Sequence, residues 1–116
     1  MKEEKFKILN YIRELIVNID KNMENFPKKD IELKNRIRNN SYDLLELAYK
    51  ANSTTNIENK QKLLEEIVAK IKTIDFLLNL CYDKQIINSK RYVKFGEKID
   101  DILKYTIGWI KSLNNN

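Results

Sequence analysis

The chain of 116 residues is long enough for one folded domain and leaves no room for a second. Two glycines and one proline offer few positions suited to tight turns, so the composition favours helices. A single cysteine excludes an internal disulfide, and the absence of histidine removes the commonest metal ligand and general base. We therefore expect one all-helical domain over residues 1–116, in the cytoplasm, with no metal or other cofactor.

Lys and Arg outnumber Asp and Glu by 22 to 17, which gives a formal net charge of +5. A basic surface attracts phosphate polyanions or an acidic protein partner, although many lysine-rich helices merely have solvated faces. No apolar run approaches the roughly 20 residues that span a bilayer, and no signal-like segment precedes the first amphipathic stretch. We expect a soluble protein with no membrane contact.

The N-terminal half predicts two amphipathic helices. The first covers about residues 3–23, with one apolar stripe at steps of three and four: Ile8, Ile12, Leu15, Ile16, Ile19 and Met23. Pro27 disfavours helical geometry at the residue before it, and Asp30 offers a side-chain cap for the next helix. This second helix covers about residues 31–51, and its stripe includes small residues that would let a neighbour approach closely.

The C-terminal half predicts two more helices. The polar run 52–56 is the clearest break, and a long apolar helix follows over about residues 57–82. Ser89 is a good N-cap for a last helix of about residues 90–113. Four amphipathic helices with short connections favour an antiparallel up-down-up-down four-helix bundle.

Several large apolar side chains lie away from the main stripes: Tyr42, Tyr49, Phe76 and Leu80. Partial shielding by neighbouring helices would account for them, since single exposed apolar side chains are ordinary. A partner surface would account for them too, and self-association into a closed homo-oligomer, plausibly a ring, would cover several such faces at once. A groove on another protein would give the same pattern.

Basic residues gather in two segments. Lys28, Lys29, Lys34, Arg36 and Arg38 surround the start of the second helix, and Lys90, Arg91, Lys94 and Lys98 occupy the start of the last one. Tyr105 and Trp109 continue near the flank of the second group, so that aromatic side chains end a basic strip. We expect largely sequence-independent phosphate contacts here, against the alternative of solvated lysines that shield the core edge.

No catalytic constellation is evident. The adjacent carboxylates at Glu65-Glu66 and Asp100-Asp101 diverge by about 100° on a helix, so neither pair can share a proton or a metal. Two isolated glycines cannot form a phosphate-cradling loop, and Cys81 beside an apolar run is better read as a small buried hydrophobe than as a nucleophile. We expect a protein that is not an enzyme and acts by binding.

Five segments resemble the accessory variability determinant (Avd) family of diversity-generating retroelements. They are residues 26–29, 33–37, 44–51, 76–89 and 108–112, the last reading Gly108-Trp109-Ile110-Lys111-Ser112. Two positions depart from the family pattern: Asn79 stands where an arginine is usual, and Ile107 replaces the first glycine of a Gly-Gly-Trp motif. The family is in turn similar to the four-helix-bundle proteins encoded within intervening sequences of 23S ribosomal RNA genes.

The resemblance implies a homopentameric, positively charged barrel of four-helix protomers. Such a barrel would bind the retroelement's reverse transcriptase and nucleic acid, template RNA or cDNA, and would support mutagenic reverse transcription and retrohoming. Tyr42, Tyr49, Phe76, Leu80, Tyr105 and Trp109 would then serve as oligomer or partner contacts. The alternatives are a stand-alone RNA-binding or protein-interaction module of the ribosomal-intervening-sequence type, and a structural homo-oligomer that binds no nucleic acid.

Overall fold

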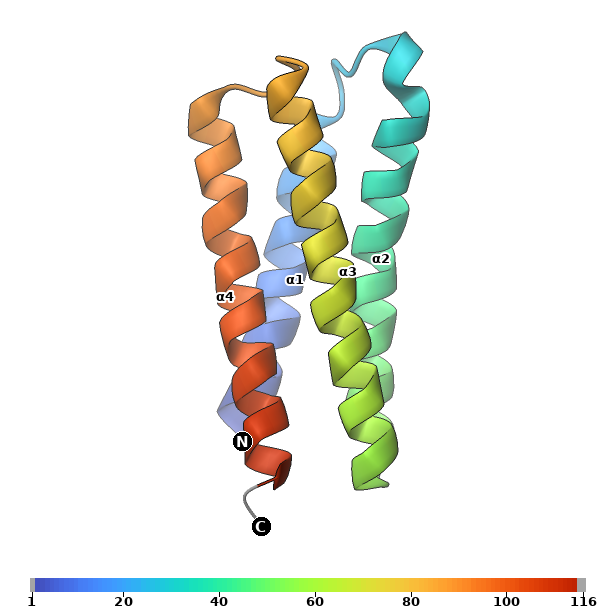
Figure 1. Cartoon of the computed structure of the whole chain (residues 1–116), viewed down its shortest axis with the longest axis vertical. Coiled ribbons are helices and arrows are strands. Elements are labelled where there is room, and N and C mark those ends of the chain that lie inside the picture. The colour runs from blue at the N-terminus through green and yellow to red at the C-terminus, as the bar shows by residue number, and fades with distance from the viewer. Residues whose placement is uncertain (1, 115–116) are drawn as a thin grey trace.

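Four long helices packed side by side make up the molecule (Figure 1). The computed structural model describes residues 2–114, with side chains from Lys7 onward. The helices are α1 (Lys2–Asn22), α2 (Ile31–Ser53), α3 (Ile57–Asp83) and α4 (Ser89–Asn114), and a short 3-10 turn, η1 (Lys28–Asp30), precedes α2. Each end lies within two residues of the sequence prediction, and the described residues contain no strand. Met1, Asn115 and Asn116, which the predicted domain included, lie outside the described residues.

The apolar stripes become one continuous core. Ile8, Ile12, Leu15 and Ile19 of α1 are buried, as are Met23 just after this helix and the apolar stripes of the other three helices. Ser41 and Thr106 are the two buried polar residues among those described, and each hydroxyl donates to a backbone carbonyl of the preceding turn, at 2.7 Å. These local hydrogen bonds satisfy the hydroxyls without a partner from another helix.

Each helix packs against the helices next to it in the chain, and α1 closes the arrangement by packing against α4. The result is an elongated molecule of 48 × 23 × 19 Å with antiparallel neighbours. The α1–α2 and α3–α4 connections lie together at one end, and the α2–α3 connection lies at the other (Figure 1). The expectation of an all-α four-helix bundle is confirmed.

The helix caps differ from the sequence prediction in two places. The carboxylate of Asp30 does not cap α2. It forms an ion pair with Lys84 at 3.1 Å instead, because η1 turns the Asp30 side chain toward the α3–α4 connection. Ser89 is the first helical residue of α4, and the cap is Asn88, whose Oδ1 accepts from the backbone N–H of Arg91 at 2.8 Å. Asn88 and Ser89 are both good caps, and the backbone path after α3 decides between them.

The α3–α4 connection begins with an unusual turn. The backbone N–H of Gln85 donates to the carbonyl of Tyr82, and that of Ile86 donates to the carbonyl of Cys81, at 2.9 and 2.8 Å. This pair of bonds is the Schellman motif that ends many helices, and the residue at the position of Gln85 is usually glycine. Gln85 instead adopts the left-handed conformation with φ of 64°, which costs a residue with a side chain about 1 kcal/mol or more.

Candidate nucleic-acid interface

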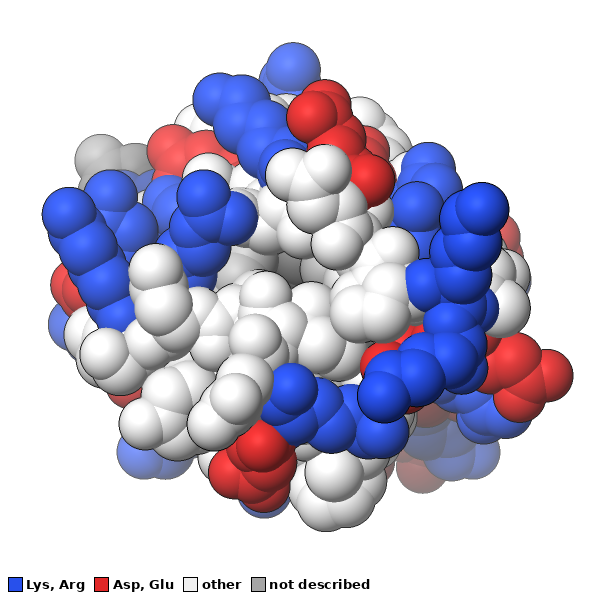
Figure 2. Space-filling model, turned by 90° about the horizontal axis from the view of Figure 1, so that it is seen from above, with Lys and Arg blue, Asp and Glu red and all other residues white. Residues whose placement is uncertain are grey.

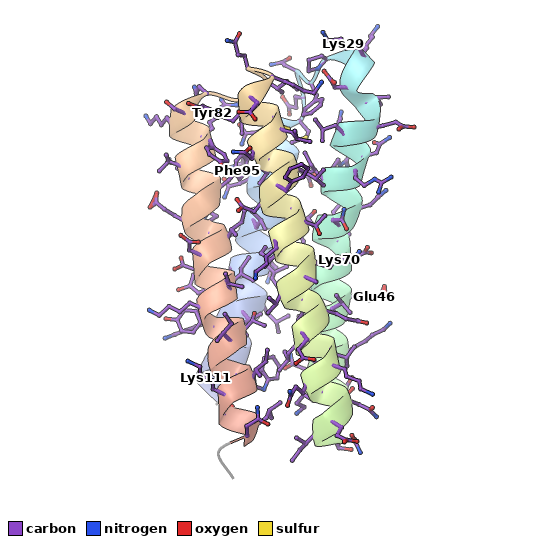
Figure 3. The ribbon with its side chains drawn as sticks, in the orientation of Figure 1. Lys29, Glu46, Lys70, Tyr82, Phe95 and Lys111 are labelled. Carbon is purple, nitrogen blue, oxygen red and sulfur yellow. The ribbon has the colours of Figure 1, made fainter. Side chains whose placement is uncertain are left out.

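The two basic segments of the sequence lie at the same end of the bundle. Because neighbouring helices are antiparallel, the start of α2 and the start of α4 both adjoin the end where the α1–α2 and α3–α4 connections meet. We call this the basic end and define it as residues 20–38 and 83–94. Figure 3 labels Lys29 and Tyr82 at this end and Lys111 at the opposite one.

The basic end carries the whole net charge of the chain. Residues 20–38 and 83–94 contain ten Lys or Arg against five Asp or Glu, which is a balance of +5. The remaining residues contain twelve of each sign. Figure 2 looks onto this end and shows blue side chains distributed around its periphery, with uncharged atoms in the middle. Charges grouped in this way produce a local field that a count over the whole chain does not reveal.

Most of the predicted phosphate ligands in the first segment are exposed. Lys28 and Lys29 project from η1, and Arg36 is exposed on the side of α2 that faces α3. Lys34 is half-buried. Arg38 already has partners within the protein: its guanidinium lies 3.4 Å from Asp20 and donates to the hydroxyl of Tyr42 at 3.2 Å. The hydrogen bond to Tyr42, together with the nearby Asp20, raises the pKa of Arg38, so it stays charged but is already paired.

The second segment spreads over two faces of α4. Each step of four residues turns the side chain by about 40°, so Lys90, Lys94 and Lys98 rotate progressively toward α1. Arg91, Lys94 and Lys98 line a groove of about 530 Å³ together with Asn18 and Asn22 of α1. Lys98 forms an ion pair with Glu14 at 3.1 Å, whereas Lys90 is exposed. The predicted strip is therefore not uniform, and its first residues are the more accessible ones.

The predicted contact residues fall on separate faces. The hydroxyl of Tyr42 lies 3.4 Å from Asp20 of α1, and Tyr49, seven residues further on, points in nearly the same direction. Phe76 is 61% exposed on α3, and Leu80 one turn later is half-buried. Tyr42 lies on the flank of α2 that adjoins α1, and α1 does not adjoin α3, so the two pairs lie on different flanks of the bundle.

Trp109 corrects one sequence prediction. Its side chain is 2% exposed and belongs to the core, so it is not a surface available to a partner. It faces the interior because it lies three residues after Thr106 and seven after Ile102, on the buried stripe of α4. The ammonium of Lys60 lies 5.9 Å from its ring centroid. Tyr105 is half-buried and stacks on Tyr11 of α1, with ring centroids 5.6 Å apart, so its ring also serves the α1–α4 contact.

Two features at the basic end were not predicted from the sequence. Tyr82 and Tyr92 stack across the α3–α4 connection, with centroids 5.0 Å apart and planes 11° apart. The side-chain amide of Asn79 donates to the hydroxyl of Tyr92 at 2.8 Å, so Asn79 fixes the position of this tyrosine. The sequence holds a signal for this stack, because Tyr82 and Tyr92 lie on either side of the 83–88 connection and a short connection brings such residues together.

No grouping of three or more His, Cys, Asp or Glu that could hold a metal occurs among the described residues. No described helix is long and apolar enough to cross a membrane. The geometry defines a four-helix bundle with one strongly basic end. No protein-family model, curated protein or solved structure matches the chain.

Proposed function

We propose that this protein is a non-enzymatic accessory protein of a diversity-generating retroelement. It binds nucleic acid and the retroelement's reverse transcriptase through the basic ends of an oligomeric assembly, and so supports mutagenic reverse transcription and retrohoming. The polymerase chemistry belongs to the partner enzyme. The retroelement and the reverse transcriptase are part of the proposal only because five segments of the chain resemble the Avd family.

One observation carries the nucleic-acid part of the proposal. The entire formal charge of +5 is concentrated at one end of a molecule that is otherwise neutral by residue count. Phosphate contacts give affinity without sequence information, and that affinity depends on salt because each neutralised phosphate releases counterions. Around a ring of protomers the basic ends would repeat, and their potentials would add.

The exposed apolar side chains support the oligomeric part. Two different patches, Tyr42 with Tyr49 on α2 and Phe76 with Leu80 on α3, suit a head-to-tail contact in which unlike surfaces meet. Head-to-tail contacts close into rings when the rotation between neighbours divides a full turn. The number five comes from the resemblance alone.

The salt dependence of RNA binding tests the basic end directly. The double variant Lys90→Gln with Lys94→Gln should weaken binding of a structureless RNA and lower the slope of log affinity against log salt by about 0.7 per lost phosphate contact. Fluorescence anisotropy of a labelled oligonucleotide from low to moderate salt measures both quantities. The matched control, Lys62→Gln with Lys111→Gln, removes the same charge from exposed positions at the opposite end.

Equal losses for the two double variants would overturn the assignment to the basic end, because they would show a diffuse effect of net charge. The partner is tested by copurification from the native host, where we expect a reverse transcriptase. RNA binding at the basic end without any reverse transcriptase would favour the stand-alone module instead. A reverse-transcriptase gene beside a template and variable repeat in the genome would support the retroelement assignment.

A further inference from the structure

A hollow of about 650 Å³ opens beside the α3–α4 connection at the basic end. Its volume lies within the range of small-molecule sites, about 300 to 1,000 Å³, and is large enough for one nucleotide. The lining comes from the last turn of α3, the connection and the first turn of α4: Tyr82, Asp83, Gln85, Ile86, Ile87, Asn88, Ser89 and Arg91. Of these residues, Ile87 belongs to the core and is 4% exposed, and Ile86 packs against the core.

One wall of the hollow is an aromatic ring held in a fixed orientation. Tyr82 stacks on Tyr92, and Tyr92 is itself fixed by the hydrogen bond from Asn79 at 2.8 Å. Tyr82 remains 39% exposed despite this contact, so part of its surface is open to a further planar group. Nucleic-acid bases stack on tyrosine in this way, and the interaction is tolerant of sequence because every base has a π-face.

The polar lining contains donors and acceptors in one small space. Gln85 is exposed, and its left-handed backbone places an amide side chain where glycine is usual. Asn88 uses its Oδ1 to cap α4, which leaves its amide N–H groups free of that bond. Asp83 contributes an acceptor that would repel a phosphate. The mixture therefore matches the edge of a base, which presents both donors and acceptors.

Two cationic side chains, Arg91 and Lys90, lie at or next to this hollow. Arg91 lines it and is exposed, and Lys90 precedes it on the outer side of α4. A guanidinium binds a phosphodiester through two parallel hydrogen bonds, so Arg91 can hold the backbone of a strand while a base enters the interior. The base and its phosphate would therefore have different partners within one lining, the amides of Gln85 and Asn88 for the base and Arg91 for the phosphate.

We propose that this hollow binds one unpaired nucleotide of the nucleic acid that the basic end attracts. The base stacks on Tyr82, its edge contacts the amides of Gln85 and Asn88, and its phosphate lies against Arg91. The inference rests on the proposed nucleic-acid binding and adds to it the class of ligand, a single strand. A base within a duplex is paired and stacked, so it cannot enter without being extruded.

Two binding measurements test this inference. The wild-type protein should bind a single-stranded oligonucleotide of about 12 nucleotides more tightly than a duplex of the same length, by anisotropy at one salt concentration. Tyr82→Ala should weaken single-strand binding by about 5-fold to 150-fold, the usual worth of one base stacked on an aromatic ring. It should leave duplex binding and the salt slope unchanged. Tyr82→Phe keeps the ring and should bind within about 2-fold of wild type.

A second readout does not depend on the folding of a variant. A single strand in which 2-aminopurine stands between abasic sites, so that no neighbouring base quenches it, should lose fluorescence on binding to the wild-type protein, because stacking on Tyr82 quenches this base. Unchanged single-strand affinity in Tyr82→Ala, with the loss in Lys90→Gln and Lys94→Gln retained, would overturn the nucleotide site and leave the proposed function standing. Absence of binding to either nucleic acid at low salt would overturn both.

Discussion

The thiol of Cys81 lies in the last turn of α3 and is fully buried beneath the α3–α4 connection. Burial, with a smaller contribution from the negative charge of Asp30, raises the pKa of this thiol to about 11, although Lys84 lowers it in part. The thiol is therefore neutral at physiological pH and is a poor nucleophile. Its position agrees with the interpretation of Cys81 as a small buried hydrophobe.

This shift predicts a loss of stability in alkaline solution. The folded pKa lies above the value of about 9 in the unfolded chain, so the contribution of Cys81 is complete below about pH 9 and is lost as pH rises toward 11. The free energy of unfolding, measured with urea at each pH, should fall more steeply over this interval in the wild type than in Cys81→Ala. Parallel curves for the two proteins would contradict the buried, neutral thiol.

Trp109 and Tyr82 show what a single residue's place in the sequence leaves undecided. Trp109 follows the basic flank of the last helix in sequence, yet its ring is buried in the core and lies 5.9 Å from the ammonium of Lys60 on α3, since the direction of a side chain becomes burial only once a neighbour is placed. Tyr82 lies at the end of an apolar helix, yet it is 39% exposed and one face of its ring stacks on Tyr92 of the next helix. Both outcomes depend on contacts between elements.

Among the helix pairs, the α3–α4 contact contains a repulsion. Asp75 of α3 and Asp100 of α4 are both acidic, and partial burial together with the charge of Asp100 raises the pKa of Asp75. A raised carboxyl pKa means that ionisation of Asp75 at neutral pH disfavours the folded state. The rest of this contact, including the stacked tyrosines, compensates for it.

Asp100→Lys should therefore stabilise the bundle by replacing this repulsion with an attraction. The gain in unfolding free energy at pH 7 should be up to about 1 kcal/mol at low salt and should shrink as salt is added. Thermal and urea unfolding followed by circular dichroism measure it. Glu97→Lys makes the same change of charge three residues earlier, at a side chain that lines the groove beside α1, and should give no such gain.

At the level of helices, the sequence predicts the long periodic segments well and their ends less well. Six apolar residues at steps of three and four leave little choice about the face of α1. The helix caps are harder to predict. Asp30 pairs with Lys84, 54 residues later in the chain, and Asn88 and Ser89 compete for the N-cap of α4. The hollow beside α3–α4 was not predicted for the same reason, since it exists only where two helices and a left-handed Gln85 meet.

For the molecule as a whole, the two separated apolar patches lead to a test of assembly. The wild-type protein should be an oligomer at micromolar concentration by light scattering. Phe76→Lys and Tyr49→Lys should each reduce it to protomers, because a head-to-tail contact needs both patches. Mixing these two variants should produce dimers, since each retains the patch that the other has lost. A wild-type monomer, or a mixture that stays monomeric, would contradict head-to-tail assembly.

The polarity of the bundle has a practical consequence for work with this protein. The beginning of α1, the end of α4 and the α2–α3 connection all lie at the end opposite the basic one (Figure 1). The molecule is 48 Å long, so a label, fused domain or solid support attached there stands well away from the basic end. A circular permutant that joins α4 to α1 and opens between Thr54 and Thr55 would keep both connections of the basic end intact.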